Sequence, residues 1–194
     1  MLNATFKIIF LIEVISITAI RSFYTLGKEP IPKKRSLHSN TDRIFMILEI
    51  IGMIIPLVYV FTSTLDFANY NSPVWVNCAG SIIFFFGILL LWRAHFDIGR
   101  FWVMDLSIME NHKLIKTGVY KYIRHPLYAS HMIWAIAQVL IFNNWIAGCS
   151  FIIVFIPHYF YRVTKEEKMM ISEFGDEYNK YINETGRLFP KFKK

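Results

Sequence analysis

The feature of this sequence that most constrains its fold is a series of apolar segments, each about as long as a membrane is thick. A hydrocarbon core of about 30 Å takes about 20 mostly apolar residues to cross as a helix. Five segments approach this length: residues 2–20, 44–62, 74–92, 126–142 and 145–161. The chain is also 55% hydrophobic and only 18% charged, which is too apolar for an ordinary soluble domain. We therefore predict an all-α integral membrane protein with about five transmembrane helices.

The first two segments carry charges within their apolar parts. Lys7 and Glu13 interrupt the first, and Glu49 interrupts the second. These charges, and the lack of a small-residue cleavage site after the first segment, favour a span over a signal peptide there. An acidic residue in mid-span is by default a functional candidate. For Glu13 and Glu49 we expect structural pairing inside the bundle.

The last two segments are separated only by Asn143 and Asn144. So short a connection predicts an antiparallel helical hairpin. Each arm has 17 residues, or about 25 Å of helix. The hairpin therefore just spans the membrane, and its ends lie among the lipid headgroups.

Basic residues orient the predicted spans. Residues 24–43, 93–125 and 162–194 hold five, six and eight Lys or Arg residues, whereas the connections 63–73 and 143–144 hold none. By the positive-inside rule the three basic regions are cytoplasmic and the N-terminus is outside. The net charge of +7 then reflects membrane orientation and attraction to anionic lipid, and it requires no nucleic-acid partner.

Cysteine usage and the absence of repeats simplify the domain organisation. Cys78 and Cys149 fall near the predicted outer ends of apolar helices, where we expect buried small residues rather than a disulfide, and no metal-ligand spacing is visible. We predict a single domain over residues 1–194, with three N-terminal spans in residues 1–92 and the polar motifs in residues 93–194.

The stretch "GVYKYIRHPLYASH", residues 118–131, places polar side chains at the start of a span. Proline is favoured at the first position of a helix, so Pro126 is expected to begin the fourth span, with Arg124 and His125 directly before it. A helix N-terminus offers free N–H groups and a positive partial charge, to which Arg124 adds a full charge. The pattern predicts an anion site at the membrane surface.

The stretch "YRVTKEEKMMISEFGDEY", residues 161–178, continues the fifth helix beyond the membrane. Its apolar residues fall on one stripe at helical spacing: Val163, Met170, Ile171 and Phe174. Glu167 lies on this stripe and is expected to face inward, whereas Glu166 can pair with Arg162 four residues earlier. Because the hairpin returns to the same face, these residues are expected near the corner formed by residues 124–128.

At this point the chain resembles a known family. The segments "LWRAHFDIGRFW", "HKLIKTGVYKYIRHPLY", "RVTKEEKMM" and "FGDEYNKYINETGRLFP" are similar to those of the isoprenylcysteine carboxyl methyltransferase family and its phospholipid methyltransferase relatives. The resemblance covers about the last 100 residues, and the first two helices match in hydropathy only. It implies a membrane-embedded methyltransferase that uses S-adenosylmethionine and releases S-adenosylhomocysteine.

The resemblance also implies positions for the site. Residues 93–194 would be the catalytic region, formed by a cofactor loop, the hairpin and a C-terminal cytosolic helix that together cap the membrane bundle. Arg162 matches a substrate-side arginine, Glu167 is added from the stripe, and Gly118 is expected to allow a tight backbone approach. The cofactor contacts carried over by position are His112, Lys113, Leu114, Ile115, Tyr120, His125, Pro126, Leu127, Tyr128 and Glu166.

The implied acceptor is the carboxylate of a prenylated cysteine or a similar lipid-tailed molecule from the bilayer. That carboxylate is already ionised and the methyl sulfonium is already activated, so no general base is required. Catalysis then consists of in-line positioning and exclusion of water. Arg162 or Arg124 is expected to hold the carboxylate, which makes these residues and Glu167 the catalytic candidates.

Other functions remain open on the sequence. N-methylation of a phospholipid headgroup would need a carboxylate to deprotonate the amine, and Glu167 or Asp105 is available. A sterol or enone reductase using NADPH can carry a similar Arg-His-Pro triplet, but the short 93–121 loop offers few sites for a dinucleotide. In a non-catalytic scaffold, Arg124 and Arg162 would be membrane anchors, and the clustering of the polar residues would be unexplained.

Overall fold

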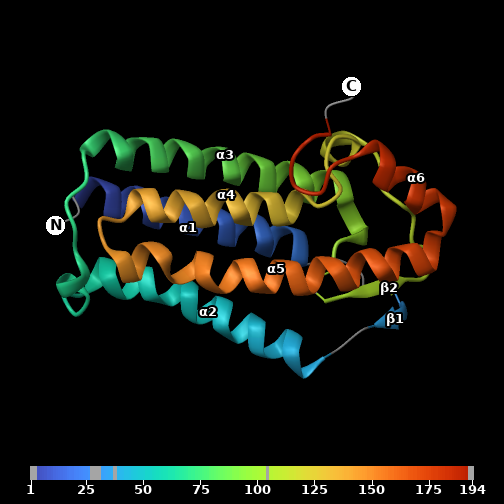
Figure 1. The fold of residues 1–194 in the computed structure, drawn as a ribbon, viewed down its shortest axis with the longest axis horizontal. Helices are drawn as coiled ribbons and strands as arrows, with labels where there is room; N and C mark the ends of the chain where they lie inside the picture. The colour runs from blue at the N-terminus through green and yellow to red at the C-terminus, as the bar shows by residue number, and fades with distance from the viewer. Residues whose placement is uncertain (1–3, 27–31, 37–38, 104, 192–194) are drawn as a thin grey trace.

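The computed structural model describes residues 4–26, 32–36, 39–103 and 105–191, which form a helical bundle with a cap at one end (Figure 1). The helices and strands are α1 (Ala4–Thr25), β1 (Lys33–Ser36), α2 (Asn40–Phe61), α3 (Val74–Ile98), β2 (Ser107–Met109), α4 (Pro126–Ile141), α5 (Trp145–Phe174) and α6 (Asp176–Glu184). Helix α4 lies between α3 and α5, while α1 packs on α3 and α2 packs along α5. The end of α5, α6 and the loops around β2 build the cap.

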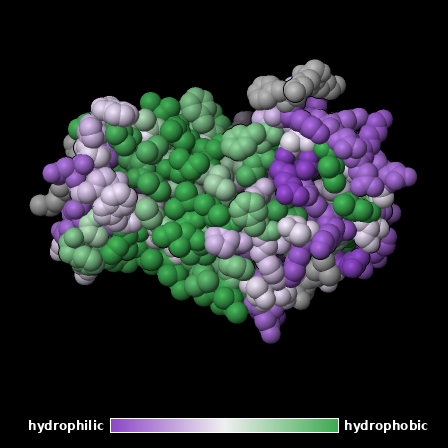
Figure 2. Space-filling model, in the orientation of Figure 1, coloured by the Kyte–Doolittle hydropathy of each residue, from purple (hydrophilic) through white to green (hydrophobic). Residues whose placement is uncertain are grey.

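The surface divides in the way that a membrane protein requires. Figure 2 shows hydrophobic residues over the bundle and hydrophilic residues over the cap. Exposed side chains on α2 include Ile47, Ile50 and Ile54, each about half exposed, a pattern suited to lipid rather than to water. Within the described chain, three helical stretches are long and apolar enough to cross a membrane: α2, α3 with its continuation to Phe101, and α5. The chain is thus an integral membrane protein, and the count of five spans stays a prediction.

The helical hairpin predicted from the short connection is confirmed. Helix α4 ends at Ile141 and α5 begins at Trp145. The side chain of Asn144 caps α5 by accepting hydrogen bonds from the backbone N–H groups of Ile146 and Ala147, at 3.1 and 2.9 Å. Helix α5 then continues to Phe174, which confirms its expected extension beyond the apolar part.

Small residues allow α3 and α4 to pack closely. A Cβ atom on Gly80 would lie 2.8 Å from the backbone nitrogen of Ile141, and one on Gly87 would lie 3.1 Å from the side chain of Ile133. Close approach of helix backbones is the usual way in which membrane helices gain packing energy, because lipid offers no hydrophobic drive between them. This contact fixes α4, and with it the loop that precedes Pro126.

Three details differ from the sequence predictions. The all-α class omits a two-stranded antiparallel sheet, in which β1 pairs with β2 and joins the segment before α2 to the loop after α3. On α5, Met169 is buried and Ile171 is exposed, because Met169 packs against Leu106 and Ile108 of the loop around β2. Cys78 is exposed rather than buried, although both cysteines are free as expected. Residues 2 and 3 of the first predicted span lie outside the described residues.

Candidate active site at the junction of bundle and cap

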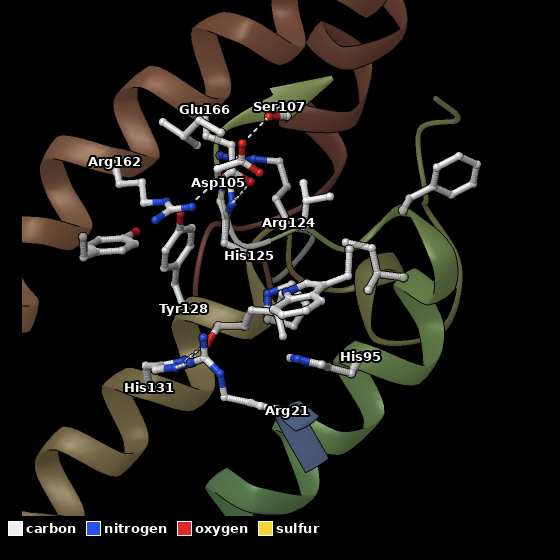
Figure 3. A pocket seen from close by; sticks show the side chains of 18 of the residues that line it. Arg21, His95, Asp105, Ser107, Arg124, His125, Tyr128, His131, Arg162 and Glu166 are labelled. Atoms are coloured by element: carbon white, nitrogen blue, oxygen red, sulfur yellow. Dashed lines mark hydrogen bonds and ion pairs between the residues drawn. The ribbon is translucent and has the colours of Figure 1, made fainter. Parts of the chain in front are cut away.

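A cavity of about 640 Å³ lies where the bundle meets the cap (Figure 3). This volume falls in the range of about 300–1,000 Å³ that small-molecule sites occupy. Apolar side chains of α1, α2 and α5, such as Ile17, Met53 and Phe155, line one part of its wall. The cap contributes polar side chains, including His112, Tyr120 and Glu166. The same cavity therefore has an apolar wall in the bundle and a polar wall in the cap.

Most of the cofactor contacts expected from the sequence meet in this cavity. Those that line it are His112, Leu114, Ile115, Tyr120, His125, Pro126, Leu127, Tyr128 and Glu166. Lys113 is exposed, and Gly118 and Glu167 lie behind the wall. These three residues were expected to contact the cofactor, but they do not line the cavity.

The close backbone approach expected at Gly118 involves another part of the protein. Gly118 has a φ of +60°, and the carboxylate of Asp97 occupies the place where a Cβ atom would be. The same carboxylate accepts a hydrogen bond of 2.8 Å from the backbone N–H of Val119. Gly118 thus attaches the loop before α4 to the end of α3, which positions Tyr120 in the wall of the cavity.

Pro126 occupies the first turn of α4 as predicted. Arg124, which was expected to add its positive charge to an anion site, is instead bound to groups of the protein. The Arg124 side chain donates hydrogen bonds to Glu167 Oε1 at 3.2 and 3.0 Å and to the backbone carbonyls of Ile182 and Thr185. Only 7% of the Arg124 side chain is exposed. Arg124 therefore connects α4 to α5 and α6, and its charge is compensated inside the protein.

Glu167 is the centre of this ionic cluster. Arg187 donates a hydrogen bond of 2.6 Å to Glu167 Oε2, and His125 Nε2 lies 3.3 Å from Oε1. The bond to Glu167 raises the pKa of Arg187. The inward orientation predicted for Glu167 is confirmed. Arg187 belongs to the "NETGRLFP" segment, but no role was predicted for it because its carboxylate partner lies 20 residues earlier in the chain.

On the cavity side of α5, Glu166 and Arg162 face α4. The hydroxyl of Tyr128 donates a hydrogen bond of 2.7 Å to Glu166 Oε2, and His125 Nδ1 lies 3.7 Å from Glu166 Oε1. Arg162 lies beside Tyr128 and points into the same space (Figure 3). The expected meeting of Arg162 and Glu166 with the corner at residues 124–128 is confirmed.

Deeper in the bundle the cavity has a second polar group of residues, which we call the floor. A nitrogen of Arg21 at the end of α1 lies 3.0 Å from His131 Nε2 on α4. Glu49 Oε1 on α2 lies 2.8 Å from His158 Nδ1 on α5, a contact that confirms the pairing expected for Glu49. For Glu13, one buried oxygen has no hydrogen-bond partner in the described part of the chain, so the expected pairing is not found there.

Sequence reasoning missed Arg21, His131 and His158 in this floor. Arg21 directly follows the first predicted span, residues 2–20, and was given no role. His131 follows Tyr128 by three residues, a helical spacing that places both on one face and was the available signal. Because these residues belong to different helices, only their packing brings them together.

Aromatic groups complete the polar wall. The ring of His112 stacks on Phe101 with 5.1 Å between centroids, and burial lowers the pKa of His112. Tyr181 donates a hydrogen bond of 2.6 Å to the backbone carbonyl of Tyr120, and burial raises the pKa of Tyr181. The side chains of His112 and Tyr181 are thus uncharged at neutral pH. Among the described residues, no three His, Cys, Asp or Glu side chains cluster in a way that could hold a metal ion.

The fold and the cavity together define an integral membrane protein with a ligand site at the boundary between its apolar bundle and its polar cap. Residues 80–172 match the model of the isoprenylcysteine carboxyl methyltransferase (ICMT) family. This segment, which contains most of α3, the loop after it, the hairpin and most of α5, is therefore similar to that family.

Individual proteins of known name are also similar to this chain. A protein-S-isoprenylcysteine O-methyltransferase of Schizosaccharomyces pombe is 35% identical over 72 residues, which are 37% of this chain and 30% of that one. Protein-S-isoprenylcysteine O-methyltransferase A of Arabidopsis thaliana is 26% identical over 142 residues, 72% of each chain. The Homo sapiens enzyme is 30% identical over 109 residues, 55% of this chain and 38% of that one. This chain thus spans less than half of the yeast and human relatives but most of the plant one.

A solved structure has the same fold. It is the eukaryotic intramembrane Ras methyltransferase ICMT, with a TM-score of 0.57 and 22% sequence identity. The similarity covers 93% of this chain and 62% of that chain. It therefore includes the N-terminal helices that lie outside residues 80–172.

Proposed function

We propose that this chain is an S-adenosylmethionine-dependent methyltransferase that methylates the carboxylate of a prenylated cysteine or a similar lipid-tailed acceptor at the membrane surface. The observation that carries the proposal is the single cavity that joins the polar cap to the apolar bundle. A water-soluble methyl donor and a lipid-borne acceptor can meet only in such a place. The match of residues 80–172 to the ICMT family model supports this proposal.

The polar part of the cavity suits the methyl donor. S-adenosylmethionine carries an ammonium group and a sulfonium group, and Glu166 offers a carboxylate that Tyr128 holds in place at 2.7 Å. The aromatic rings of His112 and Tyr120 provide a flat, uncharged wall for the adenine. When bound there, the cofactor supplies an activated methyl group. Gly118, Lys113 and Glu167 would act by shaping this wall rather than by touching the ligand.

The acceptor end needs positioning rather than proton transfer. A carboxylate acceptor is ionised at neutral pH, so the chain has only to orient it and to exclude water. Arg162 lines the cavity beside Tyr128 and is the better candidate for this role, because Arg124 is bound to Glu167 and to two carbonyls. Apolar side chains such as Phe155 exclude water from the same space.

Methylation of a phospholipid amine is less compatible with the geometry, because that reaction needs a free carboxylate as base. Glu167 is held between Arg124 and Arg187. Burial raises the pKa of Asp105, but hydrogen bonds from Lys33 and Ser107 outweigh it and hold that pKa below its ordinary value. Both carboxylates are therefore weak bases.

The proposed orientation places the cap in the cytoplasm and the N-terminus outside. The connections 63–73 and 143–144, which lack basic residues, lie at the end of the bundle opposite the cap (Figure 1). The basic residues Arg100, Lys116 and Lys121 belong to loops at the cap end. The positive-inside rule supports this orientation.

Ligand-dependent melting of the full chain in detergent tests the reaction class. We expect S-adenosylhomocysteine to raise the melting temperature, because a ligand that binds only the folded state stabilises it. Stabilisation by NADPH alone would contradict the proposal and favour a reductase. Transfer of labelled methyl groups to N-acetyl-S-farnesylcysteine then tests the acceptor, and labelling of phosphatidylethanolamine only would exclude the carboxylate mechanism.

A further inference from the structure

The segment after α6, residues 185–191, crosses the junction of bundle and cap, and we call it the strap. In Figure 1 the chain returns from α6 to the level at which α4 begins. The backbone N–H groups of Arg124 and His125 donate hydrogen bonds to the carbonyls of Gly186 and Arg187, at 2.8 and 3.0 Å. The strap is therefore attached to the turn directly before α4.

The strap is also bonded to the wall of the cavity. Arg187 donates a hydrogen bond of 2.6 Å to Glu167 Oε2, and Glu167 Oε1 lies 3.3 Å from His125 Nε2. His125 lines the cavity, as does its neighbour Glu166. The strap thus holds His125 twice, through its backbone N–H and through its ring. Displacement of the strap would loosen a residue that lines the cavity.

The strap and the turn that it pairs with each expose an aromatic ring. Leu188 packs against the apolar core of the bundle, whereas Phe189, the next residue, is 76% exposed. In the paired turn, Tyr122 is 59% exposed. Because this turn directly precedes α4, an apolar helix of the bundle, both rings lie near the boundary between the bundle and the cap. At a membrane surface, aromatic side chains are favoured at this level.

The same two segments carry an excess of basic residues. Residues 118–125 and 184–194 hold six Lys or Arg and one acidic residue, Glu184. The two arginines among them share the carboxylate of Glu167 from α5, so the lysines supply most of the excess. Two of these lysines are exposed and form no ion pair with another described residue: Lys121 and Lys191. A lysine near an anionic membrane surface gains roughly fivefold in affinity for it.

We infer that Lys121, Tyr122, Phe189 and Lys191 form a surface that binds the headgroups of acidic phospholipids, and that this binding holds the strap against the site. Charge complementarity favours an anionic leaflet over a zwitterionic one. The exposed rings favour a membrane over a soluble acidic peptide, because they can insert among the headgroups. The membrane surface would then act as an activator. The inference rests on the proposed function only for the cofactor used in its second test.

Hydrogen exchange at the backbone of residues 185–191 tests the lipid surface without cofactor or turnover. The full chain is placed in nanodiscs of phosphatidylcholine, with or without phosphatidylserine. We expect phosphatidylserine to slow this exchange about fivefold or more in the wild type, because bound lipid opposes opening of the strap. Lys121→Ala combined with Lys191→Ala should lose the difference. Arg43→Ala, which removes an exposed arginine of α2, should keep it.

Several outcomes would overturn the inference. They are equal exchange of the wild type in the two lipids, a difference that survives in the double alanine variant, and an equal loss in Arg43→Ala. Lys121→Arg combined with Lys191→Arg retains the charge and should behave as the wild type. Added salt should shrink the wild-type difference, because exposed charges are screened, and a difference that salt leaves unchanged contradicts the inference without any variant. Equal protection by soluble polyglutamate would assign the surface to an acidic protein instead.

The affinity for S-adenosylhomocysteine tests the coupling of the strap to the site. We expect phosphatidylserine to raise this affinity roughly fivefold in the wild type, but not in the double alanine variant. Protection of the strap without this gain would overturn the coupling. The proposed function fails separately. A protein whose strap is protected by phosphatidylserine, but which binds no S-adenosylhomocysteine, would retain the lipid surface and refute the function.

Discussion

Two groups of charged residues lie at different depths around the cavity, and they are organised in opposite ways. Around Glu167, each charge meets a partner within the protein, and the side chains of Arg124 and Glu167 are 7% and 8% exposed. In the floor, Arg21 lies beside His131 and interacts with Glu49, and Arg162 lines the same cavity beside Tyr128. The first arrangement is enclosed within the protein, whereas the second lines a cavity that a ligand can enter.

The difference separates residues that sequence reasoning treated alike. Arg124 and Arg162 were both expected to hold the acceptor carboxylate. Both line the cavity, but Arg124 is bound by Glu167 and by backbone carbonyls of the C-terminal tail, while Arg162 lies beside Tyr128. A guanidinium whose donors are already used inside the fold contributes to stability, and one that lines a cavity can contribute to binding. Four predictions test this division.

The largest effect is expected on stability when Glu167 is replaced. Glu167→Ala leaves Arg124 and Arg187 without their carboxylate, and breaking such a buried pair costs about 3–5 kcal/mol. We expect a melting temperature lower by roughly 10 °C, measured in detergent. Glu173→Ala is the matched control, because its ion pair with Lys34 is exposed and contributes about 0–1 kcal/mol. Equal melting of the two variants would contradict the structural role of Glu167.

Replacement of Arg162 should instead affect activity. We expect Arg162→Ala to lower kcat/KM for N-acetyl-S-farnesylcysteine about 100-fold or more, the usual cost of leaving a buried ligand charge without its partner. The affinity for S-adenosylhomocysteine should change little, as should both quantities in the Arg43→Ala control. Equal losses in transfer and in cofactor affinity would place Arg162 in the cofactor site.

A smaller effect is expected on the cofactor end. Tyr128→Phe removes the hydrogen bond of 2.7 Å that holds Glu166, and we expect the affinity for S-adenosylhomocysteine to fall about tenfold in a calorimetric titration. Tyr122→Phe, on an exposed tyrosine in the turn before α4, should bind as the wild type does. Wild-type affinity in Tyr128→Phe would show that Glu166 needs no support from this hydroxyl.

The smallest effect is expected at Asp105, which bonds to Lys33 of β1 and Ser107 of β2. Hydrogen bonds from Lys33 and Ser107 outweigh burial and lower the pKa of Asp105. Asp105 therefore stabilises the fold above the ordinary pKa of an aspartic acid, and this contribution is lost as the pH falls through the lowered pKa of the folded state. Asp105→Asn should melt below the wild type at pH 7 by the equivalent of about 0.2–1 kcal/mol, and the difference should shrink as the pH falls below the ordinary aspartate pKa of 3.8. A difference that does not shrink in acid would exclude this ion pair as its cause.

Much of the fold could be predicted because it depends on local patterns. The apolar segments, the two-residue break at Asn143 and Asn144, and Pro126 as a helix start are all readable along the chain, and the structure has helices at these positions. The pairing of β1 with β2 could not be predicted from the sequence. It joins Ser36 to Ser107, and neither short segment shows the alternating pattern that predicts a strand.

The candidate site was predictable where its residues are close in sequence. His125 and Tyr128 belong to one stretch, and the hairpin brings Glu166 to them. Arg21 could not be placed in the same way, because its partner His131 lies 110 residues away.

The sequence by itself determined that this protein resides in a membrane and that a hairpin returns its polar tail to the start of α4. These properties follow from hydropathy and chain connectivity, which are local. The motifs around Arg124 added a resemblance to a methyltransferase family. The tertiary structure alone decided which charges are used inside the fold and which line the cavity. That choice depends on helix packing, because a guanidinium such as Arg124 or Arg21 acquires its role from whichever carboxylate, carbonyl or open space lies against it.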